Sequence, residues 1–455
     1  MEYPKNLEYV KANQDASDNL DMSTEATAEE LNEAIIDEFG VKYSKDGRKL
    51  LKAPKKLNGI YSIRKGTKII CDEAFSDKFI GCLFLKSLVL PDSVTSIGDK
   101  AFGGCKSLKS LVIPDSVTTI GDYAFYDCSS LSNLVLPGGV TSIGDHAFWG
   151  CKSLKSLVLP DSVTTIGGRA FSGCESLKSL VIPDSVGNII GNPFSGWNGE
   201  LKCLSPYFIY DNKVLFDKNK SKIIAFRDKN MTSYVIPDSV TSIGDGAFWN
   251  CHSLKRLVLP DSVSSIGDWA FWNCRSLTDI VIPDSVNSIG DRMFSGCCSL
   301  KSLVIPDSVS SIGDSAFEDC YSLTGIVIPE GVTSIRHCAF RCCYSLSNIV
   351  IPNGVTSIGG CAFSRCKSLV EVVIPDSVTS IGYWAFEGCT SLRNIVIPDS
   401  VTSIGRDAFE DCKSLKSLVI PNSVTSIGDG AFGGCSFPYD LKQELISRFG
   451  KKIFW

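Results

Sequence analysis

The side chains in this 455-residue chain that could perform chemistry are mainly its 20 cysteines and 3 histidines. Five of the cysteines fall close together beside His337: Cys338, Cys342, Cys343, Cys361 and Cys366. Thiolates and imidazole nitrogens are the ligands that zinc prefers in proteins, and neighbouring thiols can also undergo redox chemistry. The cluster therefore raises a zinc or redox site as one hypothesis, although it lacks the paired C-x-x-C of common zinc sites.

Catalytic chemistry finds little support elsewhere in the sequence. His146, His252 and His337 are far apart along the chain, and they form no triad or metal motif. Serine and aspartate are abundant, but they recur beside proline and glycine, where turns explain them. We predict a protein without catalysis, cofactor or metal, and keep a thiol- or zinc-dependent enzyme as the less favoured alternative.

A repeat must position all of these side chains. Fourteen prolines recur every 23 residues, with one longer step between Pro183 and Pro237. Counted from the proline as position 0, a unit reads Pro, Asp, Ser, Val(+3), Ile(+6), Gly(+7), Ala(+10), Phe(+11), Cys(+14), Leu(+17), Leu or Ile(+20), Val(+21). A degenerate unit from Arg64 keeps Ala74 and Phe75. A fixed period of this length predicts a solenoid, here of about fifteen stacked coils.

Each coil has a predictable local structure. In Leu108 to Pro114, leucine and isoleucine alternate with serine and valine, which is typical of a short strand. Pro-Asp-Ser then predicts a turn, and Gly(+7) a second bend. We expect about two turns of helix over +8 to +14, with Ala(+10), Phe(+11) and Cys(+14) inside and positions +9 and +12 facing solvent.

Thirteen cysteines occupy position +14, where a small apolar side chain fits the end of the expected helix. They are Cys105, Cys128, Cys151, Cys174, Cys251, Cys274, Cys297, Cys320, Cys343, Cys366, Cys389, Cys412 and Cys435. Coils in register keep these residues one coil apart, and a disulfide needs particular geometry. We predict buried free thiols, which also fit a reducing compartment.

The chain divides into three parts. Residues 1–40 form an acidic segment with a helix expected at about 27–39, where Thr27 and Glu30 have the spacing of a capping box. Residues 41–435 form the solenoid, interrupted by a hairpin-like island at about 198–236. Residues 41–75 repeat the hairpin of this island and the coil after it, at an offset of 173. Residues 436–455 form a capping helix and tail.

The pattern L-x-x-L-x-[IL]-P-x-x-V-x-x-I-x-x-x-A-F-x-x-C resembles the BspA-like class of leucine-rich repeats, over residues 41–435. The resemblance implies an α/β repeat solenoid, curved and right-handed, with a parallel β-sheet on the concave face and short helical turns on the convex face. Many bacterial and protist members look like surface proteins that bind host matrix or partner cells, so the resemblance makes a cell-surface adhesin one alternative function.

The variable positions +9 and +12 suggest where a partner binds. Aromatic and histidine side chains at these positions form our candidate patch: Tyr123, Tyr126, His146, Trp149, Trp249, Trp269, Trp272 and Trp384. Tryptophan and tyrosine are enriched in binding hot spots. The rings could instead lean on one another with no partner. The valines at +21, from Val112 to Val419, offer a rival surface, because they could form an apolar groove on the sheet. They could equally reflect strand propensity, with each valine shielded by its neighbours.

Charge and hydropathy limit the partners. The net charge is −5, with acids concentrated in residues 1–40 and bases in 42–68, which we interpret as solvated charges. No apolar run approaches the length of a transmembrane helix, and the first residues lack the apolar core of a secretory signal. We expect a protein-binding scaffold with an unidentified protein partner, no nucleic acid, no membrane span and a cytoplasmic location. A removed signal would instead allow a cell-surface or secreted location.

Overall fold

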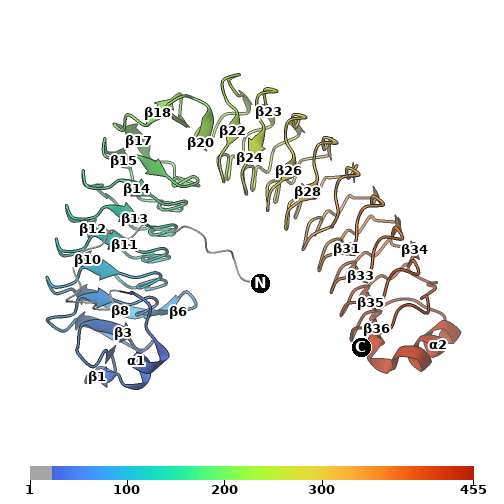
Figure 1. Ribbon diagram of the computed structural model, residues 1–455, viewed down its shortest axis with the longest axis horizontal. Coiled ribbons are helices and arrows are strands. Elements are labelled where there is room, and N and C mark those ends of the chain that lie inside the picture. The colour runs from blue at the N-terminus through green and yellow to red at the C-terminus, as the bar shows by residue number, and fades with distance from the viewer. Residues whose placement is uncertain (1–22) are drawn as a thin grey trace, which may run out of the picture.

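The chain folds into a β-solenoid of about sixteen turns that curves into an arch (Figure 1). This computed structural model describes residues 23–455, so the first part of the acidic segment lies outside the described residues. Strands and turns make up the solenoid, and helices occur only near its two ends. No helix among residues 23–455 is both long and apolar enough to cross a bilayer.

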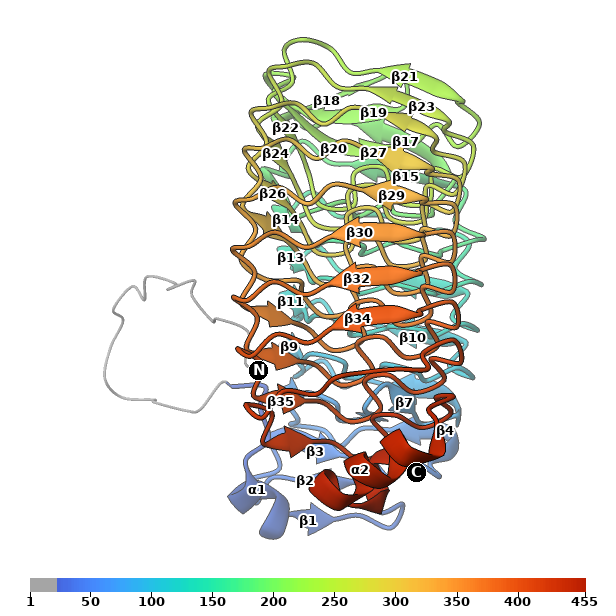
Figure 2. The ribbon, with the colours of Figure 1, turned by 90° about the vertical axis from the view of Figure 1, so that its right-hand side faces the viewer.

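One layer of parallel strands contains positions +19 to +21, where leucine or isoleucine at +20 precedes valine at +21 in the regular repeats. In Figure 2 this layer crosses the outer side of the arch, for example at β30, β32 and β34. The strands of the layer are β4 (Asn58–Ser62), β8 (Phe84–Val89), β10 (Ser110–Val112), β12 (Asn133–Val135), β15 (Ser179–Ile182), β17 (Glu200–Cys203), β21 (Ser233–Val235), β23 (Arg256–Val258), β25 (Asp279–Ile280), β27 (Ser302–Leu303), β29 (Gly325–Ile326), β30 (Asn348–Val350), β32 (Glu371–Val373) and β34 (Asn394–Val396).

A second layer of two-residue strands contains positions +5 and +6 and lines one flank of the arch. Its isoleucines point into the core. The strands are β5 (Ile69–Ile70), β9 (Ser96–Ile97), β11 (Thr119–Ile120), β13 (Ser142–Ile143), β14 (Thr165–Ile166), β16 (Asn188–Ile189), β22 (Ser242–Ile243), β24 (Ser265–Ile266), β26 (Ser288–Ile289), β28 (Ser311–Ile312), β31 (Ser357–Ile358), β33 (Ser380–Ile381), β35 (Ser403–Ile404) and β36 (Ser426–Ile427).

The segment from +8 to +14 forms successive turns, so the helix expected there is wrong. Position +9 is left-handed in most turns, with φ of 56° at Tyr123 and 59° at Trp269, and +13 is left-handed as well, as at Asp127. Two left-handed residues break a right-handed helix. Their cost is offset because alternate amides bond to the next turn: the Tyr123, Phe125 and Asp127 N–H groups donate to Asp145, Ala147 and Trp149 carbonyls.

The concave face carries these turns, and the sheet lies on the convex face, which reverses the arrangement that the resemblance implied. Figure 1 shows the small hairpin of β6 (Ser76–Asp77) and β7 (Ile80–Gly81), which extends a +12 position, on the inside of the arch. Hydrogen bonds between turns agree with this curvature, because turns lie closer together on the inside of an arch than on its outside. The distance from Asp127 N to Trp149 O in the concave segment is 2.7 Å, whereas that from Lys155 N to Ser132 O in the outer layer is 3.4 Å. The outer layer is divided into sheets of two to four strands, while the flank sheet reaches nine.

Stacked phenylalanines form the centre of the core. The Phe(+11) rings of most successive turns stack, as in Phe294–Phe317 at 5.6 Å and Phe386–Phe409 at 5.3 Å between centroids. Each ring is fully buried between its two neighbours. A single turn cannot bury these surfaces, so the stability of the fold comes from stacking.

The cysteines at +14 are buried free thiols, as predicted, and they have a further role. In successive turns the Cys S–H donates to the Phe(+11) carbonyl of the preceding turn, at 3.1 Å for Cys128 to Phe102 and 3.2 Å for Cys320 to Phe294. The same carbonyl already accepts the backbone N–H of the cysteine in its own turn, as Phe102 does from Cys105 at 3.1 Å. Cysteine therefore fills a small apolar space and adds a second, weaker bond between turns, which alanine cannot do.

The N-terminal end differs in part from the expectation. The capping box is present, because Glu30 N–H donates to Thr27 Oγ1 and Thr27 N–H to Glu30. The helix α1 (Ala28–Asn32) is much shorter than the expected 27–39, because β1 (Ile35–Ile36) follows and pairs with β2 (Lys42–Tyr43). β2 in turn pairs with β3 (Lys49–Lys52), which joins the flank sheet through β5.

The island forms the top of the arch in Figure 1. Its strands β18 (Phe208–Asp211), β19 (Val214–Asp217) and β20 (Lys222–Phe226) form antiparallel hairpins, and β20 pairs in parallel with β22. Alternate residues of β19 and β20 face different sides: Leu215 and Ala225 join the core before the island, whereas Phe216 and Ile223 join the core after it. The predicted hairpin is thus a layer between two cores.

Two helices follow the last turn of the solenoid at its C-terminal end. The helix α2 (Tyr439–Phe449) and the 3-10 helix η1 (Lys451–Phe454) cover the last turn. Gly430 and Phe432 N–H groups donate to Lys452 and Ile453 carbonyls, so the tail accepts the bonds that a further turn would accept. The end of the solenoid therefore presents few unpaired amides.

Candidate binding site on the concave face

Positions +9 and +12 lie on the concave segment, and their side chains pack along the arch from turn to turn. The left-handed backbone at +9 directs this side chain away from Ala(+10) and Phe(+11), which are buried. Tyr123 and His146 stack with parallel rings 4.4 Å apart, and Tyr126 meets Trp149 edge to face at 4.6 Å. Side chains that are distant in sequence thus form a continuous surface.

Arg169 extends this surface across the island. Its guanidinium lies 4.2 Å from the ring centre of Trp249 and 4.6 Å from that of Trp269, and its Nη1 is 3.5 Å from His146 Nε2. The turn between them has Gly191 and Asn192 at +8 and +9, which leave room for the long arginine side chain. Asn192 Nδ2 donates to the Gly246 carbonyl at 2.9 Å, which joins the two sides of the island.

Three tryptophans and a second arginine complete the surface. Trp249 contacts Trp272 at 4.1 Å and Trp269 at 5.3 Å between ring centres. Arg292 covers the other side of Trp269 at 4.4 Å. We call the whole set the aromatic ladder: Phe79, Tyr123, Tyr126, His146, Trp149, Arg169, Trp249, Trp269, Trp272 and Arg292.

Seven of the eight predicted patch residues belong to the ladder, but they are less exposed than expected. Trp249 is buried, with 8% of its surface exposed, and the other six are half-buried. Trp384, 38% exposed, lies apart from the ladder against Tyr383. The expectation that +9 and +12 face solvent ignored contacts between turns, because a large ring reaches the ring of the next turn.

Three ladder residues were absent from the predicted patch. Phe79 lies in the β6–β7 hairpin and contacts Tyr123 at 5.4 Å and Tyr126 at 5.1 Å. Arg169 and Arg292 occupy position +9, so their position pointed to the same surface. A search limited to aromatic residues overlooked them, although arginine stacks on tryptophan as readily as another ring does.

Burial controls the charges in the ladder. Burial, with the nearby Arg169 charge, lowers the pKa of His146 to about 4, so this ring is neutral near pH 7. Burial also lowers the pKa of Arg169. A cleft of about 190 Å³ opens here between His146, Arg169, Asp145 and Asp268. The site therefore combines flat rings with a cation and carboxylates, which suits recognition of a mixed polar and apolar surface.

The valines at +21 form an exposed stripe, but on the convex face and not in a concave groove. They range from 42% exposed at Val258 to 83% at Val419. The strands that carry most of these valines form the outer layer in Figure 2. Its regular spacing and its place on strands agree with strand propensity, since β-branched residues favour that conformation.

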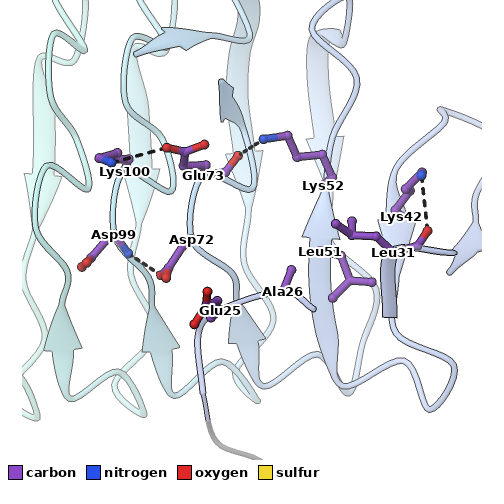
Figure 3. Close-up of a pocket in the computed structure, with 10 residues that line it drawn as sticks. All are labelled: Glu25, Ala26, Leu31, Lys42, Leu51, Lys52, Asp72, Glu73, Asp99 and Lys100. Atoms are coloured by element: carbon purple, nitrogen blue, oxygen red, sulfur yellow. Dashed lines mark hydrogen bonds and ion pairs between the residues drawn. The ribbon is translucent and has the colours of Figure 1, made fainter. Parts of the chain in front are cut away.

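A cavity of about 590 Å³ at the N-terminal end, shown in Figure 3, has its polar groups paired internally. Lys52 Nζ donates to the Glu73 carbonyl at 2.9 Å, Lys100 Nζ lies 3.4 Å from Glu73 Oε1, and the Asp99 N–H donates to Asp72. These bonds leave few groups for a ligand.

The structure places members of the predicted cysteine cluster in two different environments. Cys343 and Cys366 belong to the buried thiols at +14 and donate to Phe317 and Phe340 carbonyls. Cys338 and Cys361 lie on the concave face at +9 of adjacent turns, and Cys338 Sγ is 3.3 Å from His337 Nε2. The Cys338 thiol lowers the pKa of Cys361 by hydrogen bonding, and Arg341 acts in the same direction.

Comparison with known proteins agrees with this architecture. The family described as the BspA type leucine rich repeat region matches residues 62–199, 222–347 and 333–455. A leucine rich cell surface protein from Faecalibacterium prausnitzii is 32% identical, with 70% of this chain and 94% of that chain covered and a TM-score of 0.53. A leucine-rich repeat protein from Eubacterium ventriosum is 22% identical, covering 84% and 90%, with a TM-score of 0.50.

The likeness to the Eubacterium ventriosum protein, at 22% identity, supports the fold alone. No curated protein gives a significant match. The family matches extend over most of the repeats, whose Phe(+11) and Cys(+14) side chains build the buried core. The chain belongs to the BspA type family of leucine-rich repeat proteins.

Proposed function

We propose that the chain is a non-catalytic scaffold that binds a protein partner through the aromatic ladder on its concave face. The observation that carries the proposal is the position of the Arg169 guanidinium against both the Trp249 and Trp269 rings, which joins the two sides of the island into one surface. Tryptophan, tyrosine and arginine dominate binding hot spots. Rings that are already fixed by their neighbours lose little conformational entropy when a partner binds.

The proposal predicts which face a partner touches. A photo-crosslinking aromatic residue, p-benzoylphenylalanine, in place of Trp272 changes one ring for another and should preserve packing. The matched control carries the same residue in place of Val304, which is exposed on the convex face. Irradiation in the native host should give a discrete protein adduct at position 272 and none at 304, detected by gel shift and mass spectrometry.

A second measurement separates binding from folding. Trp269→Ala with Trp272→Ala removes the rings, and Val281→Ala with Val304→Ala removes two exposed side chains of neighbouring turns from the convex face. The crosslinked partner should bind the valine variant with unchanged affinity and the tryptophan variant at least tenfold more weakly, at a temperature where both are folded by circular dichroism. Adducts at 304 together with weaker binding of the valine variant would instead assign the binding face to the valine stripe.

A cell-surface role is the second candidate. It is supported by the likeness to the Faecalibacterium protein, which is described as a leucine rich cell surface protein. Brief protease treatment of intact native cells distinguishes it from a cytoplasmic scaffold. Loss of this protein while a cytoplasmic marker survives would support the surface role, and survival of both would support an internal location.

A further inference from the structure

A second cluster of reactive side chains lies on the concave face, several turns after the aromatic ladder. One ring nitrogen of His337, Cys338 Sγ and Cys361 Sγ all lie within 4.8 Å of one another, and His337 Nε2 is 3.3 Å from Cys338 Sγ. His337 is exposed, Cys361 is half-buried and Cys338 is buried. Two sulfurs and a nitrogen thus converge at a place that solvent can reach.

The repeat changes its chemistry at this place. In most earlier turns position +8 is aspartate, with Gly168 and Gly191 as exceptions beside the island. The aspartate Oδ1 accepts the N–H of the next +8 residue, as in Asp291 with Asp314 at 2.8 Å. The series ends where Asp314 accepts from the His337 N–H at 3.2 Å, because the next three +8 residues are His337, Gly360 and Tyr383. The two concave thiols therefore lie in a run of turns that lacks the +8 aspartate.

Tyr383 fixes the orientation of the imidazole. Its hydroxyl lies 3.5 Å from His337 Nδ1, and the ring centres are 5.8 Å apart. This contact skips one turn, and it passes over Gly360, where an added Cβ would lie 2.6 Å from the Tyr383 ring. Glycine at this position therefore allows Tyr383 to hold Nδ1 and leaves Nε2 directed at the sulfur. A partner on the second ring nitrogen is typical of metal-binding histidines.

The surrounding charges are already paired with one another. Glu318 accepts from Arg341 at 2.6 Å, and Glu387 accepts from Ser364 at 2.6 Å and lies 3.5 Å from Arg365. The cavity that contains the cluster has a volume of about 600 Å³. A dication bound by two thiolates and a neutral imidazole would have no net charge, so it would not disturb these pairs.

We propose that His337 Nε2, Cys338 Sγ and Cys361 Sγ bind one soft divalent metal ion of the zinc class. With Zn–S near 2.3 Å and Zn–N near 2.0 Å, tetrahedral ligands lie ~3.5 Å apart, close to the observed N···S separation. The two thiol protons pass to solvent on binding. Three protein ligands leave a fourth tetrahedral position open toward the concave face. This site is separate from the aromatic ladder, and it does not depend on the proposed partner binding.

Cobalt titration of the reduced, chelator-treated full chain tests the site directly. We expect one equivalent of Co²⁺ per chain with a thiolate-to-cobalt charge-transfer band, which Zn²⁺ then displaces. Cys338→Ser with Cys361→Ser should abolish the band. The matched control, Cys203→Ser with Cys298→Ser, removes two half-buried thiols elsewhere and should keep it. Circular dichroism verifies that both variants remain folded.

Two results would overturn the metal site. One is a reduced wild-type protein that gives no charge-transfer band, or a band that persists at full intensity in Cys338→Ser with Cys361→Ser. The other is protein isolated from its host under thiol trapping that contains no zinc by elemental analysis and carries a Cys338 to Cys361 disulfide by mass spectrometry, which would assign the pair to redox chemistry.

The positioning role of Tyr383 has its own readout. Tyr383→Phe and Gly360→Ala should each weaken zinc affinity about tenfold, the lower end of the effect of losing such a supporting contact, while the charge-transfer band at saturation is unchanged. Tyr344→Phe is the matched control, because Tyr344 stacks on Tyr321 outside the cluster. Affinity by chelator competition that is equal in all of these proteins would contradict the role of Tyr383.

Discussion

The guanidinium of Arg169 lies 4.2 Å from the ring centre of Trp249, although the whole island separates the two residues in sequence. The contact joins the turns on either side of the apex of the arch, where the core is divided into two parts by β19 and β20. It therefore belongs both to the candidate binding surface and to the joint between the two halves of the solenoid.

Replacing Arg169 should weaken this joint. Arg169→Lys keeps the charge but loses the flat group that stacks on Trp249 and Trp269, so we expect a loss of about 1 kcal/mol in the free energy of unfolding. Urea unfolding followed by tryptophan fluorescence measures it. Arg336→Lys, at an exposed position, is the control and should change little. Equal stabilities for both variants would mean that the stacking contributes nothing.

Thiol reactivity should differ sharply between the two kinds of cysteine. Hydrogen bonding by Cys338 lowers the pKa of the half-buried Cys361, whereas burial raises the pKa of Cys174 at +14 to about 12. In native, reduced, metal-free protein we expect Cys361 to be alkylated at least 100-fold faster than Cys174, since the thiolate is the reactive form. Peptide mass spectrometry over a time course measures both rates. Comparable rates would show that the turns open readily.

Asparagine at position +8 should give a more stable protein at pH 7 than aspartate does. Burial and the neighbouring Asp145 raise the pKa of Asp122, so the folded state favours its protonated form. The stability gained from protonating Asp122 is complete below the pKa of this carboxyl in the unfolded chain. It is lost as pH rises through the higher pKa in the folded protein, so at pH 7 the carboxylate charge is unfavourable. Asp122→Asn keeps an acceptor for the Asp145 N–H, and we expect it to raise the melting temperature at pH 7 with a smaller gain near pH 4.

The control for that substitution is Asp122→Ala, which removes the acceptor. It should lower the free energy of unfolding by about 1 kcal/mol, the ordinary contribution of one hydrogen bond. Calorimetry of the three proteins at both pH values gives the comparison. A lower melting temperature for Asp122→Asn at pH 7 would mean that the charge strengthens the bond by more than its burial costs.

Acid should loosen the aromatic ladder through His146. The pKa of this ring falls to about 4 in the folded protein, below its usual 6.5, because of burial and the Arg169 charge. Its stabilising contribution is therefore present above pH 6.5 and declines as pH falls toward 4. His146→Phe keeps a ring against Tyr123 and cannot be protonated. Between pH 7 and 4.5 the wild type should lose more stability in urea than this variant, and parallel losses would contradict the assignment.

The sequence by itself determined the repeat, the family and the contents of the core. Phe(+11), Cys(+14) and Ile(+6) could be assigned to the interior from their periodicity, because every turn meets the same two neighbours and faces the same demand for apolar volume. The capping box of Thr27 and Glu30, the island hairpin and the C-terminal helix could also be predicted, since each depends on local spacing or on residues near in sequence.

Only the tertiary structure decided the backbone of the concave segment, the faces of the arch and the grouping of the site residues. The left-handed conformations of Tyr123 and Asp127 are tolerated because their N–H groups donate hydrogen bonds to the next turn. The conformational preferences of residues within one turn do not include these bonds. The face on which the sheet lies depends on the relative spacing of all turns. The contacts of Arg169 with Trp249 and of Tyr383 with His337 skip a turn, and they exist because small residues, Asn192 and Gly360, lie between.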